Sequence, residues 1–476
     1  MEIAVGATQG GGTSWVVTCY SSPMESKLTF FGGAGSVTGA NFLFETGGLK
    51  VLIDCGLEQG SSFGTNKNYE NFGYDPAGID LLLVTHAHAD HIGRVPKLVR
   101  NGFRGVMYST PATRDLSEVM FADAVRILED EAHKRGVAPL YDEHDIETAL
   151  SLWKTLEYHE SFEIGDDITV RFLDAGHILG SAMVEFTRAG RTFVATGDLG
   201  NSPAPLLCDT EVLTNANYLL MESVYGDRVH ENRGDRVALL RAALKDTYEK
   251  KRTLLIPAFA MQRTQLLLYE INNMVEGGEV PEMPVFLDSP LASKVTDIYR
   301  NYTHLFNDRV QKEIAGGDDV LAFPEFTIVR DAKESQHILE APAPKVIIAG
   351  SGMSVGGRVL MHEKQLLGDP NTTLLFIGYQ GVGTLGRRIQ DGEHEVTIEK
   401  EKVRVRARIE TINGFSAHKD RDGLVDFVRT TSKTLEKVFV AMGEPKSSHV
   451  LAERLHELLG VDAIAPREGE TQVLAF

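Results

Sequence analysis

Three histidines and one aspartate gather within six consecutive residues, His86-Ala87-His88-Ala89-Asp90-His91. Neutral imidazole and carboxylate groups are preferred zinc ligands, so this spacing predicts a zinc site. In a turn, His86 and His88 can bind one ion while Asp90 and His91 point toward a second ion nearby. A solvated polar loop is the competing interpretation. Only 15 of the 476 residues are histidine, however, and their clustering here favours the metal site.

The metal-binding segment needs an element before it and another after it. Residues 81–84, Leu-Leu-Leu-Val, form a short apolar run that is typical of a strand buried on both faces. Residues 92–99 can begin a helix if Pro96 lies in its first turn. The ligands are therefore expected on a strand-to-helix turn. Asp54 ends another predicted strand, residues 51–54, and we expect it to hydrogen-bond the metal-binding segment and orient its ligands.

Two further ligands are predicted where later strands end. His177 follows the extended run 172–174, and Asp198 follows the apolar run 192–196. A histidine can complete one tetrahedral site, and a carboxylate can bridge two cations. The predicted ligand sets are His86, His88 and His177 for one zinc, Asp90 and His91 for the other, and Asp198 between them.

The remaining chain predicts the elements around this centre. Residues 27–31 and 41–44 predict strands joined by the glycine-rich segment 32–39, which lacks a Gly-Lys-Ser/Thr ending and a following helix. That segment is expected to be a tight hairpin near the metal centre rather than a phosphate-binding loop. Residues 113–134 predict an amphipathic helix on a sheet. The apolar residues at helical spacing are Leu116, Val119, Met120, Ala124, Ile127 and Leu128.

Beyond residue 226 the pattern changes to short strands that alternate with helices. Strands are predicted at 253–257, 284–288, 345–350 and 373–378, and helices at 237–248, 262–275 and 291–302. Such alternation indicates βαβ units and a parallel sheet, hence a separate α/β domain inserted into the first. Residues 403–408 alternate strictly, which predicts a strand with Arg404, Arg406 and Arg408 on its solvated face. Strand and helix return at 437–442 and 451–459.

The motif order His-x-His-x-Asp-His, then His177, then Gly197-Asp198, resembles the metallo-β-lactamase fold, with Asp54 matching its first signature residue. The resemblance implies a four-layered αββα sandwich that binds its metals at one edge. It covers roughly residues 27–226 and the C-terminal end.

A second set of motifs resembles the β-CASP branch of that superfamily. Glu222 follows a predicted strand, an α/β insertion comes next, and a Phe-Ser-Ala-His-x-Asp segment contains His418. The segments 256–260, 288–290, 350–353 and 383–387 look most like the RNA-cleaving members, which include bacterial and archaeal relatives of the mRNA 3′-end-processing endonuclease. The expected architecture is an α/β metallo-β-lactamase αββα sandwich with an inserted β-CASP domain built on a parallel sheet. The expected divisions are a disordered lead at 1–26, the sandwich at 27–226, the β-CASP domain at 227–396 and the returning part of the sandwich at 397–476.

The resemblance implies a function and roles for particular residues. The branch consists of zinc-dependent nucleases, so the expected activity is hydrolysis of phosphodiester bonds in single-stranded RNA by a metal-activated hydroxide. Glu222 and His418 would form an acid–histidine pair in which His418 protonates the leaving oxygen. Asp90 would bind the second of two zinc ions and help to orient the hydroxide.

One position departs from the family pattern. Met442 stands before Gly443-Glu444, where the family has a histidine that completes the second zinc site. A thioether is a poor ligand for a zinc otherwise bound by oxygen and imidazole. We therefore expect the second site to be weaker, or to be completed by water, substrate or another side chain such as His449.

Substrate-binding residues are predicted in loops of the inserted domain. Guanidinium groups can hold phosphates, although a surface salt bridge is an equally good interpretation of each arginine singly. Two serines beside glycines, with neighbouring backbone N–H groups, are similar candidates. The predicted set is Arg263, Ser351, Ser354, Arg358, Arg387 and Arg388.

Composition limits the setting. The formal net charge of −19 argues against binding nucleic acid through a global positive field, so an RNA substrate needs a local basic lining. Three cysteines are too few for a disulfide framework, and no signal peptide or membrane span is seen, which predicts a cytoplasmic protein that binds no membrane. The expected partner is single-stranded RNA. A homodimer is also expected, although the sequence does not fix the oligomeric state. Met24 is predicted to be the natural start.

Three other functions compete with the ribonuclease. A DNA nuclease of the same branch ranks second, because DNA-processing members also lack a histidine at the position of Met442. A small-molecule hydrolase would leave the long inserted domain and the Glu222–His418 pair without a purpose. A non-catalytic RNA-processing scaffold is the alternative from another class, but it would have little reason to keep the predicted ligands.

Overall fold

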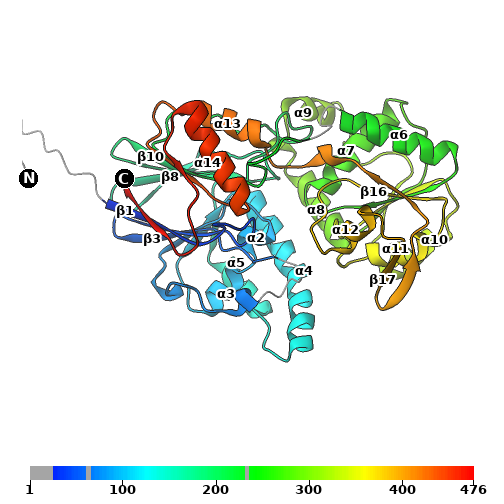
Figure 1. Ribbon diagram of the computed structural model, residues 1–476, viewed down its shortest axis with the longest axis horizontal. Helices are drawn as coiled ribbons and strands as arrows, with labels where there is room; N and C mark the ends of the chain where they lie inside the picture. Colours follow the sequence, from blue (N-terminus) through cyan, green and yellow to red (C-terminus); the bar gives the residue numbers. More distant parts are fainter. Residues whose placement is uncertain (1–24, 60–65, 231–234) are drawn as a thin grey trace, which may run out of the picture.

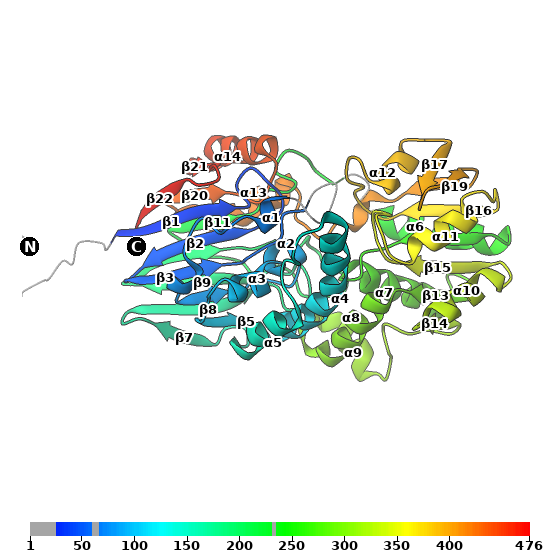
Figure 2. The same cartoon turned by 90° about the horizontal axis from the view of Figure 1, so that it is seen from below.

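The computed structural model describes residues 25–59, 66–230 and 235–476, and it arranges them in two halves that lie side by side (Figure 1). Met24 and most of the predicted lead, residues 1–26, lie outside the described residues. The first half contains two sheets that stack face to face, and the second half contains a third sheet (Figure 2).

The first sheet has seven strands in the order β22-β1-β2-β3-β4-β5-β6. Neighbours are antiparallel from β22 to β3 and parallel from β3 to β6. The strands are β22 (Thr471–Ala475), β1 (Glu25–Gly32), β2 (Asn41–Thr46), β3 (Leu49–Ile53), β4 (Leu81–Leu83), β5 (Val106–Ser109) and β6 (Trp153–Thr155).

The second sheet also has seven strands, in the order β21-β20-β11-β10-β9-β8-β7. It is parallel from β21 to β10 and antiparallel from β10 to β7. The strands are β21 (Ala463–Ile464), β20 (Lys437–Val440), β11 (Tyr218–Met221), β10 (Arg191–Ala195), β9 (Ala182–Arg188), β8 (Ile168–Asp174) and β7 (Ser161–Ile164).

The core between these sheets follows from alternation along the strands. In β3, Val51 and Ile53 face the second sheet, whereas Leu52 faces the helices on the other side, as the two-residue period of a strand requires. Phe44 is central to this interior, with ring centroids 5.2 Å from Phe186 and 4.7 Å from Phe193. Large buried aromatic side chains therefore hold the two sheets together.

Helices cover the outer faces of the two sheets. Those beside the first sheet are α1 (Asn66–Tyr69), η1 (Pro76–Gly78), α2 (Ala89–Ile92), α3 (Val95–Arg100), α4 (Pro111–Arg135) and α5 (Glu143–Ser151). Those on the second sheet are α13 (Arg421–Arg429) and α14 (Pro445–Leu459), with η4 (Asn413–Phe415) just before them. Helix α4 confirms the predicted amphipathic helix, but its buried stripe is rotated. Leu116 and Leu128 are buried as expected, Ile127 is exposed, and Phe121 and Val125 take its place in the core.

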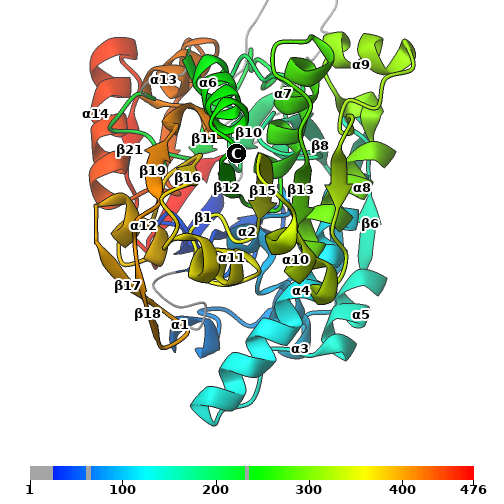
Figure 3. The same ribbon diagram turned by 90° about the vertical axis from the view of Figure 1, so that its right-hand side faces the viewer.

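The third sheet is parallel throughout, in the order β14-β13-β15-β12-β16-β19. Its strands are β14 (Phe326–Ile328), β13 (Val285–Asp288), β15 (Lys345–Ala349), β12 (Thr253–Pro257), β16 (Thr372–Phe376) and β19 (Arg408–Thr411). Figure 3 shows α6 and α7 on one side of this sheet and α10 and α11 on the other. The helices of this half are α6 (Arg236–Glu249), α7 (Arg263–Glu276), α8 (Pro290–Asn301), η3 (Thr303–Leu305), α9 (Asp308–Ala315), α10 (Ala332–Glu340), α11 (Val359–Leu366) and α12 (Leu385–Gln390).

The single alternating strand expected at 403–408 is wrong. Residues 403 and 404 end β18 (Glu401–Arg404), which forms a hairpin with β17 (Glu395–Ile398). β19 begins only at Arg408 and pairs with β16. The alternation of apolar and charged residues cannot reveal this break, because the two-residue period of β18 continues into β19. β19 lies beyond residue 396, where the inserted domain was expected to end, and the domain boundaries stay a prediction.

The predicted αββα sandwich with an additional parallel α/β domain is confirmed. The two halves are joined by packing between α4 and α8 and by a hydrogen bond of 2.7 Å from the Tyr302 hydroxyl to Asp115. In the part of the chain that the structure describes, every helix is too short or too polar to cross a membrane.

Candidate metal centre

The metal-binding segment runs from the end of β4 into α2, as the sequence predicts. Asp54, at the end of β3, fixes its start, since its two carboxylate oxygens accept hydrogen bonds of 2.8 Å from the Thr85 N–H and the Thr85 hydroxyl. Asp54 also accepts a hydrogen bond of 2.7 Å from His91 Nδ1. The expected contact between Asp54 and the metal-binding segment is confirmed.

These hydrogen bonds decide which ring nitrogens face inward. The Thr85 hydroxyl gives its proton to Asp54, so at 3.1 Å it can only accept from His86 Nδ1. When the two rings are neutral, His86 Nε2 and His91 Nε2 keep lone pairs for a metal. Burial alone would lower the pKa of His91, but Asp198 and Asp54 raise it well above its usual range, so a metal at Nε2 takes the place of a proton. His91 Nε2 is buried and has no hydrogen-bond partner among the described residues, which suits a nitrogen that binds a metal.

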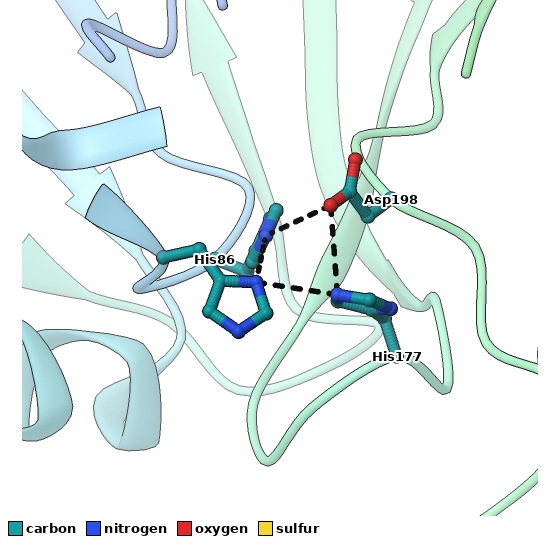
Figure 4. A group of neighbouring side chains, drawn as sticks. His86, His177 and Asp198 are labelled. Atoms are coloured by element: carbon teal, nitrogen blue, oxygen red, sulfur yellow. Dashed lines mark hydrogen bonds and ion pairs between the residues drawn. The ribbon is translucent and has the colours of Figure 1, made fainter. Parts of the chain in front are cut away.

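Four donor atoms converge on one point, as Figure 4 shows for His86, His177 and Asp198. His88 Nδ1 lies 3.1 Å from His86 Nε2 and 3.2 Å from His177 Nε2. Asp198 Oδ2 lies 3.4 Å from His86 Nε2 and 3.5 Å from His177 Nε2. Neighbouring ligands in a zinc tetrahedron with bonds of about 2.0–2.1 Å are about 3.3 Å apart. The donor set therefore fits one zinc ion.

The charge states suit the same role. Burial lowers the pKa values of His88 and His177 well below the usual range, which leaves both rings neutral and able to bind a metal. Burial alone would raise the pKa of Asp198, but His91, His86 and His418 lower it far below its usual value. His88 and His177 thus face the Asp198 carboxylate as neutral imidazoles.

A second position lies on the other side of Asp198. Its Oδ1 is 3.4 Å from His91 Nε2, and the half-buried Asp90 lies close enough for its pKa to respond to both groups. Burial raises the pKa of Asp90, and His91 only partly offsets this. Asp90 and His91 lie beside Asp198 on this side, and their binding of a second ion stays a prediction.

Glycine allows the aspartate loop to approach the histidine loop. Gly197 has a φ of 53°, and a Cβ there would lie 2.7 Å from the Thr85 side chain. A larger residue would force apart the loops that carry Asp198 and His86.

Glu222 and His418 meet beside the four donor atoms. His418 Nδ1 lies 3.1 Å from Glu222 Oε1 and 3.9 Å from Asp198 Oδ2, and its ring centroid is 4.5 Å from that of His177. Backbone pairing between Gly200 and His418 holds the two loops together. Burial alone would lower the pKa of His418, but Glu222 and Asp198 raise it to about 9. The ring is therefore charged at neutral pH.

Met442 is buried and packs with the aromatic core between the two sheets. Its backbone has a φ of 47°, and its N–H donates to Gly33 O. His449 is exposed on α14, and its Nδ1 is bonded to Pro445 O, so no described contact joins it to the ligands. The alternative that His449 completes the second site gains no support.

Five of the six predicted substrate-binding side chains fall into three groups. Arg358 donates to Asp288, Val329 O and Arg330 O, and buried Ser354 donates to Glu363, so both are engaged inside the protein. Arg387 and Arg388 are half-buried and form salt bridges with Asp391 and Glu393, respectively. Ser351 is half-buried, and its hydroxyl accepts a hydrogen bond from Val355 N–H.

Arg263 differs from the other arginines. Its Nη1 donates to Ile377 O at 2.9 Å, and none of the described carboxylates forms an ion pair with it. Burial lowers its pKa to about 10. Tyr225, whose ring centroid is 6.2 Å from that of His418, and Arg236 also act on its pKa. Arg263 is a half-buried cation near the candidate centre, without a carboxylate partner among the described residues.

Sequence reasoning missed several residues of the centre. Thr85 sets the His86 tautomer, the Ser181 hydroxyl accepts from His177 N–H, and His230 Nε2 donates to His418 O. Lys419, buried beside His418, donates to Gly200 O and Ser202. Thr85 adjoins His86 and could have been found by position. The others depend on contacts between distant segments.

Comparison with known proteins finds three domain matches and several relatives. Residues 37–247 match the metallo-β-lactamase superfamily, 264–389 the β-CASP domain, and 402–466 the Zn-dependent metallo-hydrolase RNA specificity domain. Ribonuclease TTHA0252 of Thermus thermophilus is 37% identical over 444 residues, which cover 93% of this chain and 99% of that protein. Transcription termination factor FttA of Methanosarcina mazei is 32% identical over 95% of this chain and 72% of that protein. A crystal structure of an Enterococcus faecalis protein of unknown function matches with a TM-score of 0.59 and 13% identity, covering 95% of this chain and all of that one, which shows the fold alone.

Proposed function

Because the chain belongs to the β-CASP branch of the metallo-β-lactamase superfamily, we propose that it is a zinc-dependent ribonuclease that hydrolyses phosphodiester bonds of single-stranded RNA. The observation that carries this proposal is the Glu222–His418 pair, placed 3.1 Å apart beside four converging metal donors. An RNA-specificity domain match and a relative named as a ribonuclease favour RNA over DNA and over a small-molecule substrate.

The proposal assigns one zinc to His86, His88, His177 and Asp198, and a second to Asp90, His91 and Asp198. Zinc bound there makes water a nucleophile at neutral pH and offsets negative charge on the phosphate. The second ion has one protein ligand fewer than the family pattern provides, because Met442 is buried in the core and is a thioether. We therefore expect it to bind more weakly than the first.

The protein side chains supply the proton transfer. Glu222 is fully buried and accepts hydrogen bonds from His418 Nδ1 and from Leu199 N–H, which fixes its orientation. His418 Nε2 is then free to give a proton to the leaving oxygen, and its raised pKa keeps it charged at neutral pH. The role proposed for Asp90 is to orient the attacking water. A general acid of this kind contributes about 10²–10⁴-fold to the rate.

Arg263 is the strongest of the proposed phosphate contacts, because its guanidinium lies near the centre without a carboxylate partner among the described residues. Ser351, Arg387 and Arg388 stay proposals of lower rank, since each is already bonded within the protein. A half-buried guanidinium without a carboxylate partner gains most from a phosphate, which restores the interactions that burial removed.

We also propose a cytoplasmic setting. The structure describes Cys55 and Cys208, and neither forms a disulfide. A reducing compartment suits free thiols. The homodimer stays a prediction.

The test is incubation of the zinc-loaded protein with end-labelled single-stranded RNA and with DNA of the same sequence, reading product lengths over time. Cleavage of RNA well above that of DNA is expected. Equal or preferential cleavage of DNA would favour the DNA nuclease. Stoichiometric zinc with no cleavage of either strand would favour the non-catalytic scaffold. Product lengths also distinguish internal cutting from cutting at an end.

A further inference from the structure

Four exposed apolar side chains lie on three loops of the inserted domain, and we call them the apolar rim. They are Phe259, Val355, Tyr379 and Val382, with exposed fractions of 42%, 53%, 49% and 78%. The loops follow β12, β15 and β16, which are adjacent strands of the parallel sheet. Single exposed apolar residues are ordinary, whereas several on neighbouring loops indicate a binding surface.

Close contacts bring the three loops of the rim together. A Cβ added to Gly352 would lie 2.7 Å from the Phe259 ring, so that ring rests directly on the loop that carries Val355. Gln380 donates a hydrogen bond of 2.9 Å to Gly352 O, which ties the loop of Tyr379 and Val382 to the same place. The three loops thus present their apolar side chains together.

The rim lies on the edge of the third sheet that adjoins the metal centre. Gln262 follows β12 and accepts a hydrogen bond from the Tyr299 hydroxyl, which in turn accepts from Leu179 N–H, two residues after His177. On the other side, Arg263 lies within contact distance of Gly378, the residue before Tyr379. Arg263 is therefore close to the rim, and it is also close enough to Tyr225, the neighbour of His418, for that side chain to act on its pKa.

This arrangement combines flat rings with an unpaired cation. Single-stranded nucleic acid offers both complements, because its bases expose apolar faces and its backbone carries a phosphate at each step. Aromatic side chains stack on bases in such proteins without strong sequence preference. A duplex fits poorly, since its bases already stack on one another.

We propose that the apolar rim is a base-stacking surface for single-stranded RNA, in which Phe259 and Tyr379 contact unpaired bases while Arg263 holds a phosphate between the rim and the metal centre. The inference rests on the proposed ribonuclease function and adds to it the part of the substrate that the inserted domain recognises. It also explains how a chain of net charge −19 binds a polyanion, since stacking does not depend on charge.

Ring-removing variants test the proposal. Phe259→Ala and Tyr379→Ala should each raise KM for a short oligoribonucleotide by roughly 5- to 150-fold, the range expected for one lost base stack, with little change in kcat. Tyr379→Phe keeps the ring and should behave as wild type. Phe259→Leu keeps apolar volume without a flat ring and should resemble Phe259→Ala. Val473→Ala, an exposed apolar position on β22, is the matched control.

An abasic nucleotide moved along the oligoribonucleotide identifies the stacked base. At one position along the oligoribonucleotide, the abasic nucleotide should raise the KM of the wild type. In Phe259→Ala or Tyr379→Ala the same substrate should raise KM little further, because the missing ring and the missing base belong to one interaction. RNA binding is measured separately by fluorescence anisotropy. Unchanged KM and Kd in both alanine variants, with RNA still cleaved by the wild type, would overturn the stacking surface and leave the ribonuclease standing. A wild-type KM for Phe259→Leu would overturn it in favour of a general apolar contact, such as a protein partner. A wild type that neither cleaves nor binds RNA would refute the ribonuclease and the stacking surface together.

Discussion

Asp54→Asn changes one oxygen to an amide nitrogen at the residue that orients two of the predicted metal ligands. Asp54 accepts three hydrogen bonds, from Thr85 N–H, the Thr85 hydroxyl and His91 Nδ1. If the remaining oxygen stays on Thr85 N–H, the new NH₂ group faces two donors. His91 must then surrender the proton at Nδ1, which moves to Nε2 and blocks the lone pair meant for a metal. The Thr85 hydroxyl also loses its acceptor. His86 is therefore affected only through Thr85, whereas His91 is affected through its own bond to Asp54.

Loss of such an orienting group typically weakens metal affinity by about 10–100-fold, which corresponds to about 1.4–2.7 kcal/mol. The ion bound by His91 should be lost before the ion bound by His86, because only His91 bonds Asp54 directly. The assay is competition for zinc with a chelator, followed by the zinc content per chain. Asp80→Asn is the matched control, since the carboxylate of exposed Asp80, just before β4, accepts from Lys50 N–H rather than from Thr85 or a predicted ligand. Unchanged zinc retention in Asp54→Asn, or equal loss in Asp80→Asn, would refute the assigned tautomers.

Four further predictions concern the same centre. His418→Ala should keep its zinc and lose turnover by about 10²–10⁴-fold, whereas His86→Ala should lose zinc as well, and zinc analysis beside rate measurements separates them. Glu222→Gln removes one of the carboxylates that raise the pKa of His418 to about 9. Since His418 must be protonated to act, the alkaline limb of the pH profile of kcat/KM should move to lower pH. An alkaline limb that does not move would count against the Glu222–His418 pair. Met442→His should raise retained zinc toward two ions per chain after dialysis against a weak chelator, with no gain expected at the first site. Arg263→Ala should weaken RNA binding and reduce the dependence of RNA affinity on salt concentration. Arg387 is already paired with Asp391, so Arg387→Ala should change the affinity and its salt dependence only slightly.

Exposed apolar side chains other than the rim help to define what the rim is. Ile127 on α4, Leu458 on α14 and Val473 on β22 are exposed on separate elements. Isolated positions of this kind are ordinary on protein surfaces. The rim differs because three loops that are far apart in the sequence meet at the ends of adjacent strands, on the side where Arg263 and the metal centre lie.

The amino-acid sequence by itself determined the local elements and the ligand types. Strand β12 was predicted at 253–257 and occupies Thr253–Pro257, because an apolar run of this length between turns has few alternatives. The metal-binding segment was equally clear, since imidazoles and carboxylates at such short spacing have a narrow range of uses. The motif order and its resemblance to a known family predicted which distant residues would join them, and the structure brings His177, Asp198, Glu222 and His418 together.

Only the tertiary structure decided which arginine and serine side chains are available. Arg358 and Ser354 look like phosphate ligands in the sequence, but Asp288 and Glu363 engage them inside the fold, whereas Arg263 is left without a carboxylate partner among the described residues. It also decided that the alternation at 403–408 breaks between two sheets and that the buried stripe of α4 is rotated. The physical reason is common to all of these cases. Periodicity and side-chain chemistry are properties of neighbouring residues, but burial and pairing depend on segments that folding brings from elsewhere in the chain.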